Sequence, residues 1–154
     1  MAKEIERKFL VKSDSWRQLA QGSVYRQGYI STQKAATVRV RIADNRGYLT
    51  IKGRSEKYTR AEFEYVIPVA DAQEMLDTLC DRPLIEKVRY KIDWAGLTWE
   101  IDEFDGANKG LIIAEVELSD KQQQIELPDW IGEEVSDDPR YFNSNLAKVP
   151  FSQW

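Results

Sequence analysis

Polar and apolar residues alternate along most of this chain, as they do in β-strands whose two faces meet different surroundings. In the first such stretch, Glu4, Glu6 and Lys8 share one face. Ile5 and Phe9 lie on the other face. Taken alone, this stretch favours a solvated strand face over a cation site. The alternation recurs, however, and it predicts about eight strands, over residues 4–11, 24–30, 37–42, 48–53, 60–67, 85–94, 97–104 and 111–118.

Segments with apolar residues at helical spacing interrupt and follow these strands. Ser13 or Asp14 can cap a helix within residues 12–21, and Asp71 can cap one that runs to about residue 81. Three further short helices are expected near the C-terminus, over residues 119–126, 131–135 and 141–148. The apolar stripes of such helices need an apolar sheet face to cover.

The charged faces of the predicted strands are uneven in sign. Some strands carry only acids and others only bases, whereas solvated faces usually mix the two. The acidic pairs are Glu62/Glu64, Glu100/Asp102 and Glu115/Glu117, and the basic pairs are Arg39/Arg41 and Lys87/Arg89. An open sheet with its polar face in water therefore fits less well than a closed one. We expect a mainly β (α+β) fold, a closed eight-stranded antiparallel barrel or tunnel with a charged interior and an apolar exterior partly covered by helices.

The composition limits the number of domains, the possible partners and the cellular compartment. The 154 residues suit a single domain over residues 1–154, and the net charge of -4 provides no basic field for nucleic acid. The single cysteine, Cys80, excludes an internal disulfide and fits a reducing compartment. No apolar run reaches the length of a membrane helix, and no signal peptide precedes the first strand. We therefore expect a soluble, cytoplasmic protein without a membrane partner, and no particular protein partner is predicted.

Histidine is absent, which removes the usual general base and any histidine-based zinc site. A metal in this protein would be a hard, oxygen-bound cation such as Mg²⁺, Mn²⁺ or Ca²⁺. Charges inside a barrel cost several kcal/mol each unless they are paired or solvated. A polyphosphate with divalent cations would satisfy both signs, because Arg and Lys bind phosphate oxygens and carboxylates hold the metal.

With these charged pairs in place, the chain resembles the triphosphate tunnel metalloenzymes, also called the CYTH superfamily. Glu4-Ile5-Glu6-Arg7-Lys8 matches the Glu-x-Glu-x-Lys signature of that family. The later charged residues match in order: Arg39-x-Arg41, Lys52, Glu62-x-Glu64, Lys87-x-Arg89, Glu100-x-Asp102 and Glu115-x-Glu117. The resemblance runs from residue 4 to about residue 148, and the short length is similar to the bacterial single-domain tripolyphosphatases of this family.

The resemblance implies a divalent-metal-dependent hydrolase that cleaves the terminal phosphoryl group of inorganic triphosphate with metal-activated water. It implies Mg²⁺ or Mn²⁺, with two ions per site. The metal site would comprise Glu4, Glu6, Glu115 and Glu117, with Glu62 and Glu64 holding a second cation or the attacking water. The phosphate-binding residues would be Lys8, Arg39, Arg41, Lys52, Lys87 and Arg89. The catalytic set would be Glu4, Glu6, Lys8, Tyr29, Glu62 and Glu64.

Several roles stay open at this stage. Glu100 and Asp102 could bind metal, orient an Arg or Lys side chain, or relay a proton. Some family members carry a catalytic Lys where this chain has Tyr29, so Tyr29 is either a substrate contact or a packing residue. Tyr141 and Ser144 either close one tunnel mouth from a C-terminal helix or only pack there.

The positions of the aromatic residues bear on the substrate class. An organic triphosphate needs an apolar platform for its ring, and the alternation leaves only Tyr25 and Tyr29 facing the interior. The aromatic residues assigned to the outer face are Phe63, Tyr65, Tyr90 and Trp99. Inorganic triphosphate is therefore favoured. The alternatives are a nucleoside or thiamine triphosphatase, an enzyme like the class IV adenylate cyclases, or a non-catalytic polyphosphate-binding module.

Overall fold

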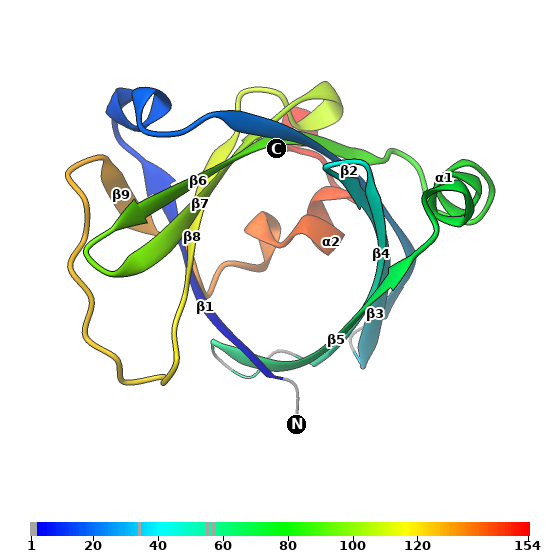
Figure 1. Cartoon of the computed structure of the whole chain (residues 1–154), viewed down its shortest axis with the longest axis horizontal. Coiled ribbons are helices and arrows are strands. Elements are labelled where there is room, and N and C mark those ends of the chain that lie inside the picture. The colour runs from blue at the N-terminus through cyan, green and yellow to red at the C-terminus, as the bar shows by residue number, and fades with distance from the viewer. Residues whose placement is uncertain (1–2, 34, 55, 57) are drawn as a thin grey trace.

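The computed structural model describes residues 3–33, 35–54, 56 and 58–154 of the chain. Strands of these residues form one sheet in the order β5-β4-β3-β2-β6-β7-β8-β1-β9, and a further pairing of β5 with β1 closes eight of them into a ring (Figure 1). The eight-stranded antiparallel tunnel predicted from the sequence is thus confirmed. The strands are β1 (Lys3–Val11), β2 (Gly22–Gln33), β3 (Ala36–Ala43), β4 (Arg46–Gly53), β5 (Thr59–Ile67), β6 (Ile85–Trp94), β7 (Leu97–Phe104), β8 (Ile112–Glu117) and β9 (Ile131–Glu134).

Strand β1 closes the ring because both of its edges are paired. One edge meets β8, where Glu6 lies opposite Glu117. The first part of the other edge meets β5, where Glu4 lies opposite Arg60. Farther along the same edge, β1 pairs with β9 instead. This arrangement places the charged residues at the start of β1 between the acidic faces of β5 and β8.

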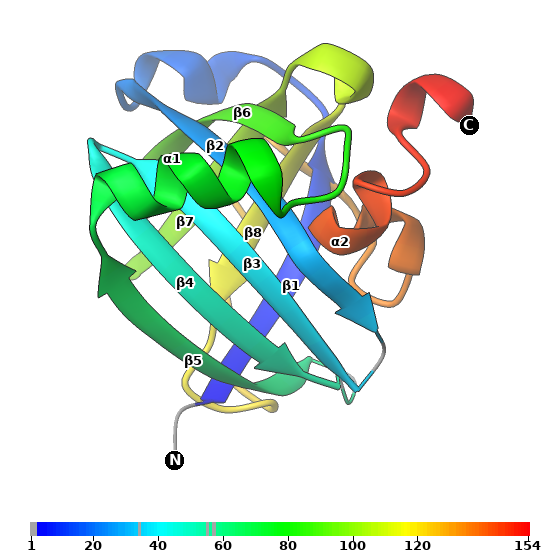
Figure 2. The same cartoon turned by 90° about the vertical axis from the view of Figure 1, so that its right-hand side faces the viewer.

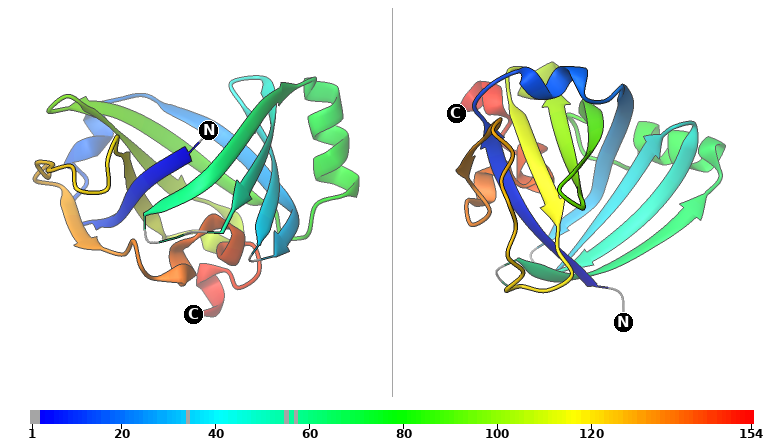
Figure 3. Two further views of the ribbon diagram at one scale, coloured as in Figure 1. Left: turned by 90° about the horizontal axis from the view of Figure 1, so that it is seen from below. Right: turned by 60° about the vertical axis from the view of Figure 1, so that its left-hand side comes forward.

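The largest core cluster among the described residues combines aromatic and aliphatic side chains and covers the outer face of β1, β7 and β8. Trp99 of β7 is completely buried there and contacts Phe9 and Trp130 at ring-centroid distances of 5.6 and 5.9 Å. Trp16, from the 3₁₀ turn η1 (Ser15–Gln18), is also fully buried in this cluster. The connection between β8 and β9 passes outside the ring beside β1 (Figure 3). The apolar exterior of the tunnel is therefore sealed partly by loops.

The helix α1 (Val69–Thr78) covers the outer face of β3 and β4 (Figure 2). Its Ala72 and Leu76 are completely buried and pack in one cluster with Val40 of β3. Gly47 of β4 lies directly below this helix, and a Cβ atom there would come within 2.8 Å of the Ala72 Cβ. The small residues Gly47 and Ala72 thus allow α1 to pack close against the sheet.

Three predicted helices are absent from the structure. Within residues 12–21 only the turn η1 forms. Residues 119–126 are not helical, since Gln123 Oε1 accepts hydrogen bonds from both the backbone N–H and the hydroxyl of Ser119 and so holds a side-chain turn. Residues 131–135 were expected to be helical, but Ile131–Glu134 is strand β9, which pairs with the edge of β1 that β5 leaves free.

The remaining helix predictions are partly correct. Helix α1 begins earlier than expected, with Pro68 rather than Asp71 as its N-cap. The predicted helix at 141–148 contains α2 (Asn143–Leu146), between the turns η3 (Pro139–Tyr141) and η4 (Phe151–Gln153). Within the described ranges, no helix has the length and apolar character needed to cross a bilayer.

Candidate active site

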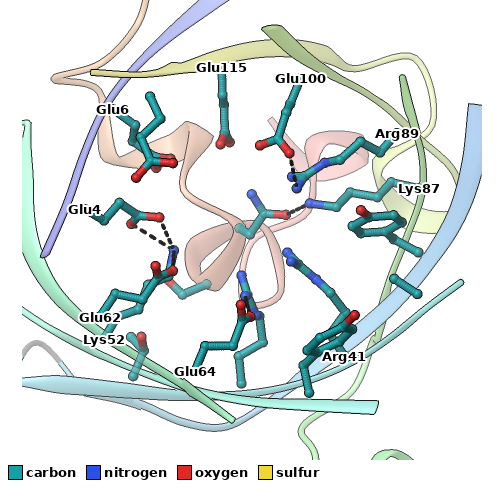
Figure 4. Close-up of a pocket in the computed structure, with 18 of the residues that line it drawn as sticks. Glu4, Glu6, Arg41, Lys52, Glu62, Glu64, Lys87, Arg89, Glu100 and Glu115 are labelled. Carbon is teal, nitrogen blue, oxygen red and sulfur yellow. Dashed lines mark hydrogen bonds and ion pairs between the residues drawn. The ribbon is translucent and has the colours of Figure 1, made fainter. Parts of the chain in front are cut away.

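The charged faces of the strands line a cavity of about 300 Å³ inside the ring (Figure 4). Glu4, Glu6 and Glu62 lie on one side of it, and Arg41, Lys87 and Arg89 lie on the other. All but one of the site residues predicted from the sequence are in its lining: Glu4, Glu6, Lys8, Tyr29, Arg39, Arg41, Lys52, Glu62, Glu64, Lys87, Arg89, Glu100, Glu115 and Glu117. The predicted residue outside the lining is Asp102.

The acidic side of the cavity holds carboxylates that destabilise one another. Glu6 of β1 lies close to Glu115 of β8, since the two strands are paired through Glu6 with Glu117 and Lys8 with Glu115. Burial raises the pKa of Glu6 to about 7, and the charges of Glu115 and Glu4 add to this shift. Burial and the Glu4 charge also raise the pKa of Glu117. This side of the cavity is therefore short of positive charge.

Cations of the cavity bind two of these carboxylates. Lys52 Nζ donates to the two carboxylate oxygens of Glu4 at 2.9 and 3.1 Å, and Arg60 Nε donates to Oε1 of the same group at 3.1 Å. Although burial opposes ionisation, the charges of Lys52 and Arg60 outweigh it and lower the pKa of Glu4 to about 2. Lys8 forms an equivalent ion pair with Glu115. Two lysines that the sequence assigns to phosphate thus neutralise carboxylates that it assigns to metal.

On the basic side, Asp102 organises two cations. Its carboxylate accepts two hydrogen bonds from Arg89, at 2.7 and 2.9 Å, and lies 2.8 Å from Lys87 Nζ. The Asp102 side chain is only 1% exposed, and it does not reach the cavity surface. Of the three roles considered for Asp102, this geometry favours the orientation of Arg89 and Lys87. Glu100 differs, because it lines the cavity and lies 3.3 Å from Arg89.

Arg41 is a cation without such an anion. It takes part in no ion pair among the described residues, and its Nε instead donates to the Gln27 side-chain oxygen at 2.8 Å. The ring of Tyr25 lies 5.0 Å from the Arg41 guanidinium and 4.9 Å from that of Arg89, within the range of cation–π attraction. Burial and the charges of Arg39 and Arg89 lower the pKa of Arg41 to about 9. An anion placed between these guanidinium groups would relieve the repulsion.

The predicted interior tyrosines are both buried in the cavity wall. Tyr29 is 5% exposed, packs in a cluster with Ile85 and Phe104, and still lines the cavity. Packing and access to the cavity therefore occur together at Tyr29. Tyr48 also lines the cavity, so the prediction that only Tyr25 and Tyr29 face the interior is wrong. Tyr48 shares the inward face of β4 with Lys52, and this parity could have identified it.

Helix α2 lies across one mouth of the tunnel (Figure 1). Ser144 lines the cavity, in agreement with the expectation of a closing segment. Tyr141 instead belongs to a core cluster and contacts Trp154 at a ring-centroid distance of 5.1 Å. Tyr141 therefore packs, and only part of the segment faces the site.

The sequence analysis also missed other cavity residues, of which Arg60 and Asn143 carry the most important contacts. Arg60 shares the inward face of β5 with Glu62 and Glu64, and this parity could have identified it. Asn143 reaches the cavity from α2, and its Oδ1 accepts a hydrogen bond from Lys87 Nζ at 3.0 Å. No strand pattern pointed to Asn143, because it lies outside the barrel wall.

The acidic side of the cavity has the donor chemistry that a hard divalent cation requires. Its potential ligands are carboxylate oxygens from β1, β5 and β8, and burial together with their mutual repulsion raises the pKa of Glu6. Across the residues the structure describes, no group of three or more acidic or cysteine side chains is gathered in metal-binding geometry. The carboxylates therefore fit a divalent cation in chemistry, and they would have to exchange their lysine partners for it.

Comparison with known proteins gives a consistent family relationship. The CYTH domain model matches residues 2–148 of the chain. An inorganic triphosphatase of Acetivibrio thermocellus is 54% identical over 154 residues, which cover 100% of this chain and 99% of that protein. An inorganic triphosphatase of Nitrosomonas europaea is 36% identical over 148 residues, or 94% of this chain and 96% of that protein.

Solved structures show the same fold. The crystal structure of an inorganic triphosphatase superposes with a TM-score of 0.66 at 34% identity, covering 96% of this chain and 95% of the other. A protein from Hippeastrum, described as a putative adenylyl cyclase with a dominant triphosphatase activity, has a TM-score of 0.59 at 19% identity, covering 76% of this chain and 80% of that one. The latter similarity concerns the fold alone.

Proposed function

Because the chain belongs to the CYTH family, we propose that it is a divalent-metal-dependent hydrolase that cleaves the terminal phosphoryl group of inorganic triphosphate. The observation that carries this proposal is the division of one cavity into a basic side with an uncompensated cation, Arg41, and a crowded acidic side. A triphosphate carries negative charges over its whole length, and its metal ions carry the opposite charge. The pair together satisfies both sides of the cavity.

The basic residues would bind the phosphate oxygens. Arg89 and Lys87 are already held in place by Asp102, and Arg39 is held by Thr50, whose hydroxyl accepts from Arg39 Nη2 at 3.2 Å. Fixed donors of this kind neutralise charge that shifts during phosphoryl transfer without having to reorganise. The remaining phosphate-binding residues would be Lys8, Arg41 and Lys52.

The carboxylates would hold Mg²⁺ or Mn²⁺, with two ions per site. Glu4, Glu6, Glu115 and Glu117 would provide the main site, with Glu62 and Glu64 at the second. When bound, the ions supply a Lewis acid for phosphate oxygens and lower the pKa of water. In the structure Lys52 is hydrogen-bonded to the Glu4 carboxylate, and Lys8 forms an ion pair with Glu115. Transfer of these two lysines to the phosphates would free both carboxylates, so substrate and metal would assist each other's binding.

The aromatic residues of the cavity favour an inorganic substrate. The Tyr25 ring is engaged by Arg41 and Arg89, and the Tyr29 ring is packed in the core. Among the aromatic residues of the lining, only Tyr48 has neither a cation–π contact nor a place in a core cluster of the described residues. A nucleobase or thiamine ring would therefore have little surface on which to stack. The Tyr29 hydroxyl is a candidate substrate contact.

A phosphate-release screen tests the proposal. Tripolyphosphate, pyrophosphate, ATP and thiamine triphosphate are each incubated with Mg²⁺ or Mn²⁺, and orthophosphate is measured. We expect the highest kcat/KM for tripolyphosphate and no release without divalent metal. Higher activity on ATP or thiamine triphosphate would identify an organic triphosphatase, and a cyclic nucleotide product would identify a cyclase. Tight binding of tripolyphosphate without phosphate release under any condition would identify a binding module.

Two further predictions concern the partners of the protein and its location in the cell. The net charge of -4 argues against a nucleic-acid partner. A cytoplasmic location stays a prediction based on the single cysteine, Cys80.

A further inference from the structure

The side-chain amide of Asn143 lies in a hydrogen-bonded chain that joins two cations of the cavity. Its Oδ1 accepts from Lys87 Nζ at 3.0 Å and from Gln27 Nε2 at 3.3 Å. Gln27 Oε1 in turn accepts from Arg41 Nε at 2.8 Å. The chain thus runs from β6 through α2 to β2 and β3, and it links the helix at the tunnel mouth to the phosphate-binding side.

The chemistry of the end groups fixes the direction of both amides. In their charged forms Lys87 and Arg41 can only donate hydrogen bonds, so each amide turns its oxygen toward a cation. The Gln27 side chain is completely buried, and this arrangement satisfies both its oxygen and its nitrogen. The oxygen of Asn143 is committed to Lys87 and Gln27. Its Nδ2 group donates to no other described residue and is not among the buried unsatisfied atoms, and Asn143 lines the cavity.

Arg41 depends on this chain more than its neighbours do. Arg89 and Lys87 are held by the Asp102 carboxylate, whereas the polar contact of Arg41 in the described part of the chain is with Gln27. Without Asn143, Gln27 would lose the acceptor for its amide nitrogen and could rotate. Arg41 would then lose its orientation, and Lys87 would lose one of its two partners.

We propose that Asn143 is a phosphate-positioning residue of the triphosphate site. Its Oδ1 orients Lys87 directly and Arg41 through Gln27, and its Nδ2 donates a hydrogen bond to a phosphate oxygen. The inference rests on the proposed function, because the ligand is taken to be triphosphate. It also assigns a role in substrate binding to α2, beyond closing the tunnel mouth.

Binding of tripolyphosphate to the metal-free protein tests this role without reference to turnover. Isothermal titration calorimetry in excess EDTA compares wild type with Asn143→Ala, Asn143→Asp and the control Lys148→Ala. Lys148 anchors the same segment to β2, with its Nζ 3.3 Å from the Thr32 carbonyl, but it is not part of the cavity lining. We expect Asn143→Ala to weaken binding about tenfold to a hundredfold, as for loss of hydrogen bonds to charged groups. Asn143→Asp should bind still more weakly because it adds a negative charge, and Lys148→Ala should stay within about twofold of wild type.

Steady-state kinetics with Mg²⁺ separate positioning from a general structural defect. A positioning role predicts that Asn143→Ala raises KM for tripolyphosphate more than it lowers kcat, with a melting temperature similar to that of Lys148→Ala. If Asn143→Ala does not fold, Asn143→Ser is measured in its place with the same expected direction. Wild-type affinity and KM in the folded variant would overturn the proposal.

A double-mutant cycle tests the link through Gln27. Because Gln27→Ala and Asn143→Ala break the same chain, their combined effect on tripolyphosphate affinity should be smaller than the product of the single effects. Independent effects that multiply would refute the link to Arg41. If wild type itself neither binds nor hydrolyses tripolyphosphate, the proposed function fails. If wild type does both and the Asn143 variants are unchanged, only this inference fails.

Discussion

Substitution of Asp102 by Asn should destabilise the metal-free protein strongly, although the two side chains have nearly the same volume. The Asp102 carboxylate is 1% exposed and neutralises two cations, with atoms 2.7 to 2.9 Å from Arg89 and 2.8 Å from Lys87. Removing one partner of a buried ion pair leaves an uncompensated charge and costs about 3–5 kcal/mol. Domains of this size have a free energy of unfolding of about 5–15 kcal/mol, so the variant should still fold.

Urea denaturation at neutral pH, in EDTA, measures this loss. Glu100→Gln is the matched control, because Glu100 contacts the same arginine at 3.3 Å but its side chain is 32% exposed. Exposed ion pairs contribute little, so we expect Glu100→Gln to cost less than about 1 kcal/mol. Tripolyphosphate should recover part of the loss in Asp102→Asn, since it supplies anionic oxygens to Arg89 and Lys87.

The pH dependence of the loss follows from the pKa of Asp102. Burial opposes its ionisation, but the charges of Arg89 and Lys87 outweigh burial and hold this pKa below the usual range. A lowered carboxyl pKa stabilises the folded state above the unfolded-state pKa, and the contribution disappears as the pH falls through the folded-state value. The difference between wild type and Asp102→Asn should therefore be largest near neutral pH and shrink in acid. A difference below about 1 kcal/mol at pH 7 would show that Asp102 does not hold these cations.

Three further predictions concern the metal and the phosphates. Glu4→Gln and Glu6→Gln should each abolish phosphate release while circular dichroism and melting remain those of a folded protein; near-wild-type turnover at saturating Mg²⁺ would contradict the metal-site assignment. Arg39→Ala should raise KM for tripolyphosphate and lower kcat with little change in Mg²⁺ affinity, and steady-state kinetics with unchanged constants would make Arg39 structural. Because the pKa of Glu6 is raised from 4.5 to about 7, its contribution to stability is present below pH 4.5 and is lost as the pH rises to 7 in the metal-free protein. Saturating Mg²⁺ should remove that loss in melts across this pH range, and identical profiles with and without metal would refute the Glu6 assignment.

The strands and the charged interior could be predicted because both follow from a period of two residues. In β7 the sequence alternation places Trp99 outside and Glu100 inside, and the structure places Trp99 in the outer core and Glu100 in the cavity lining. Once one face of every strand in a ring is charged, closure brings those faces together regardless of strand order. The same parity identified the side of β5 that carries Glu62, and it could also have identified Arg60.

The strand Ile131–Glu134 and the cavity residue Asn143 depend on contacts that local sequence does not specify. Ile131–Glu134 forms a strand because β5 pairs with only part of the β1 edge. The free part of that edge exists only once the ring has closed. Asn143 lies on a four-residue helix outside the barrel wall, so neither strand parity nor the family signature indicated it. The exchange of partners at Glu4 was equally hidden, because parity shows which side chains face inward and not which of them pair.

The central claim is that one cavity binds a triphosphate with metal and directs water to its terminal phosphoryl group. Hydrolysis of tripolyphosphate in ¹⁸O-labelled water, followed by phosphorus NMR, tests this claim most directly. We predict equimolar orthophosphate and pyrophosphate, with the label in orthophosphate and no reaction in EDTA. Label in pyrophosphate, metal-independent turnover, or no hydrolysis with either Mg²⁺ or Mn²⁺ would contradict it.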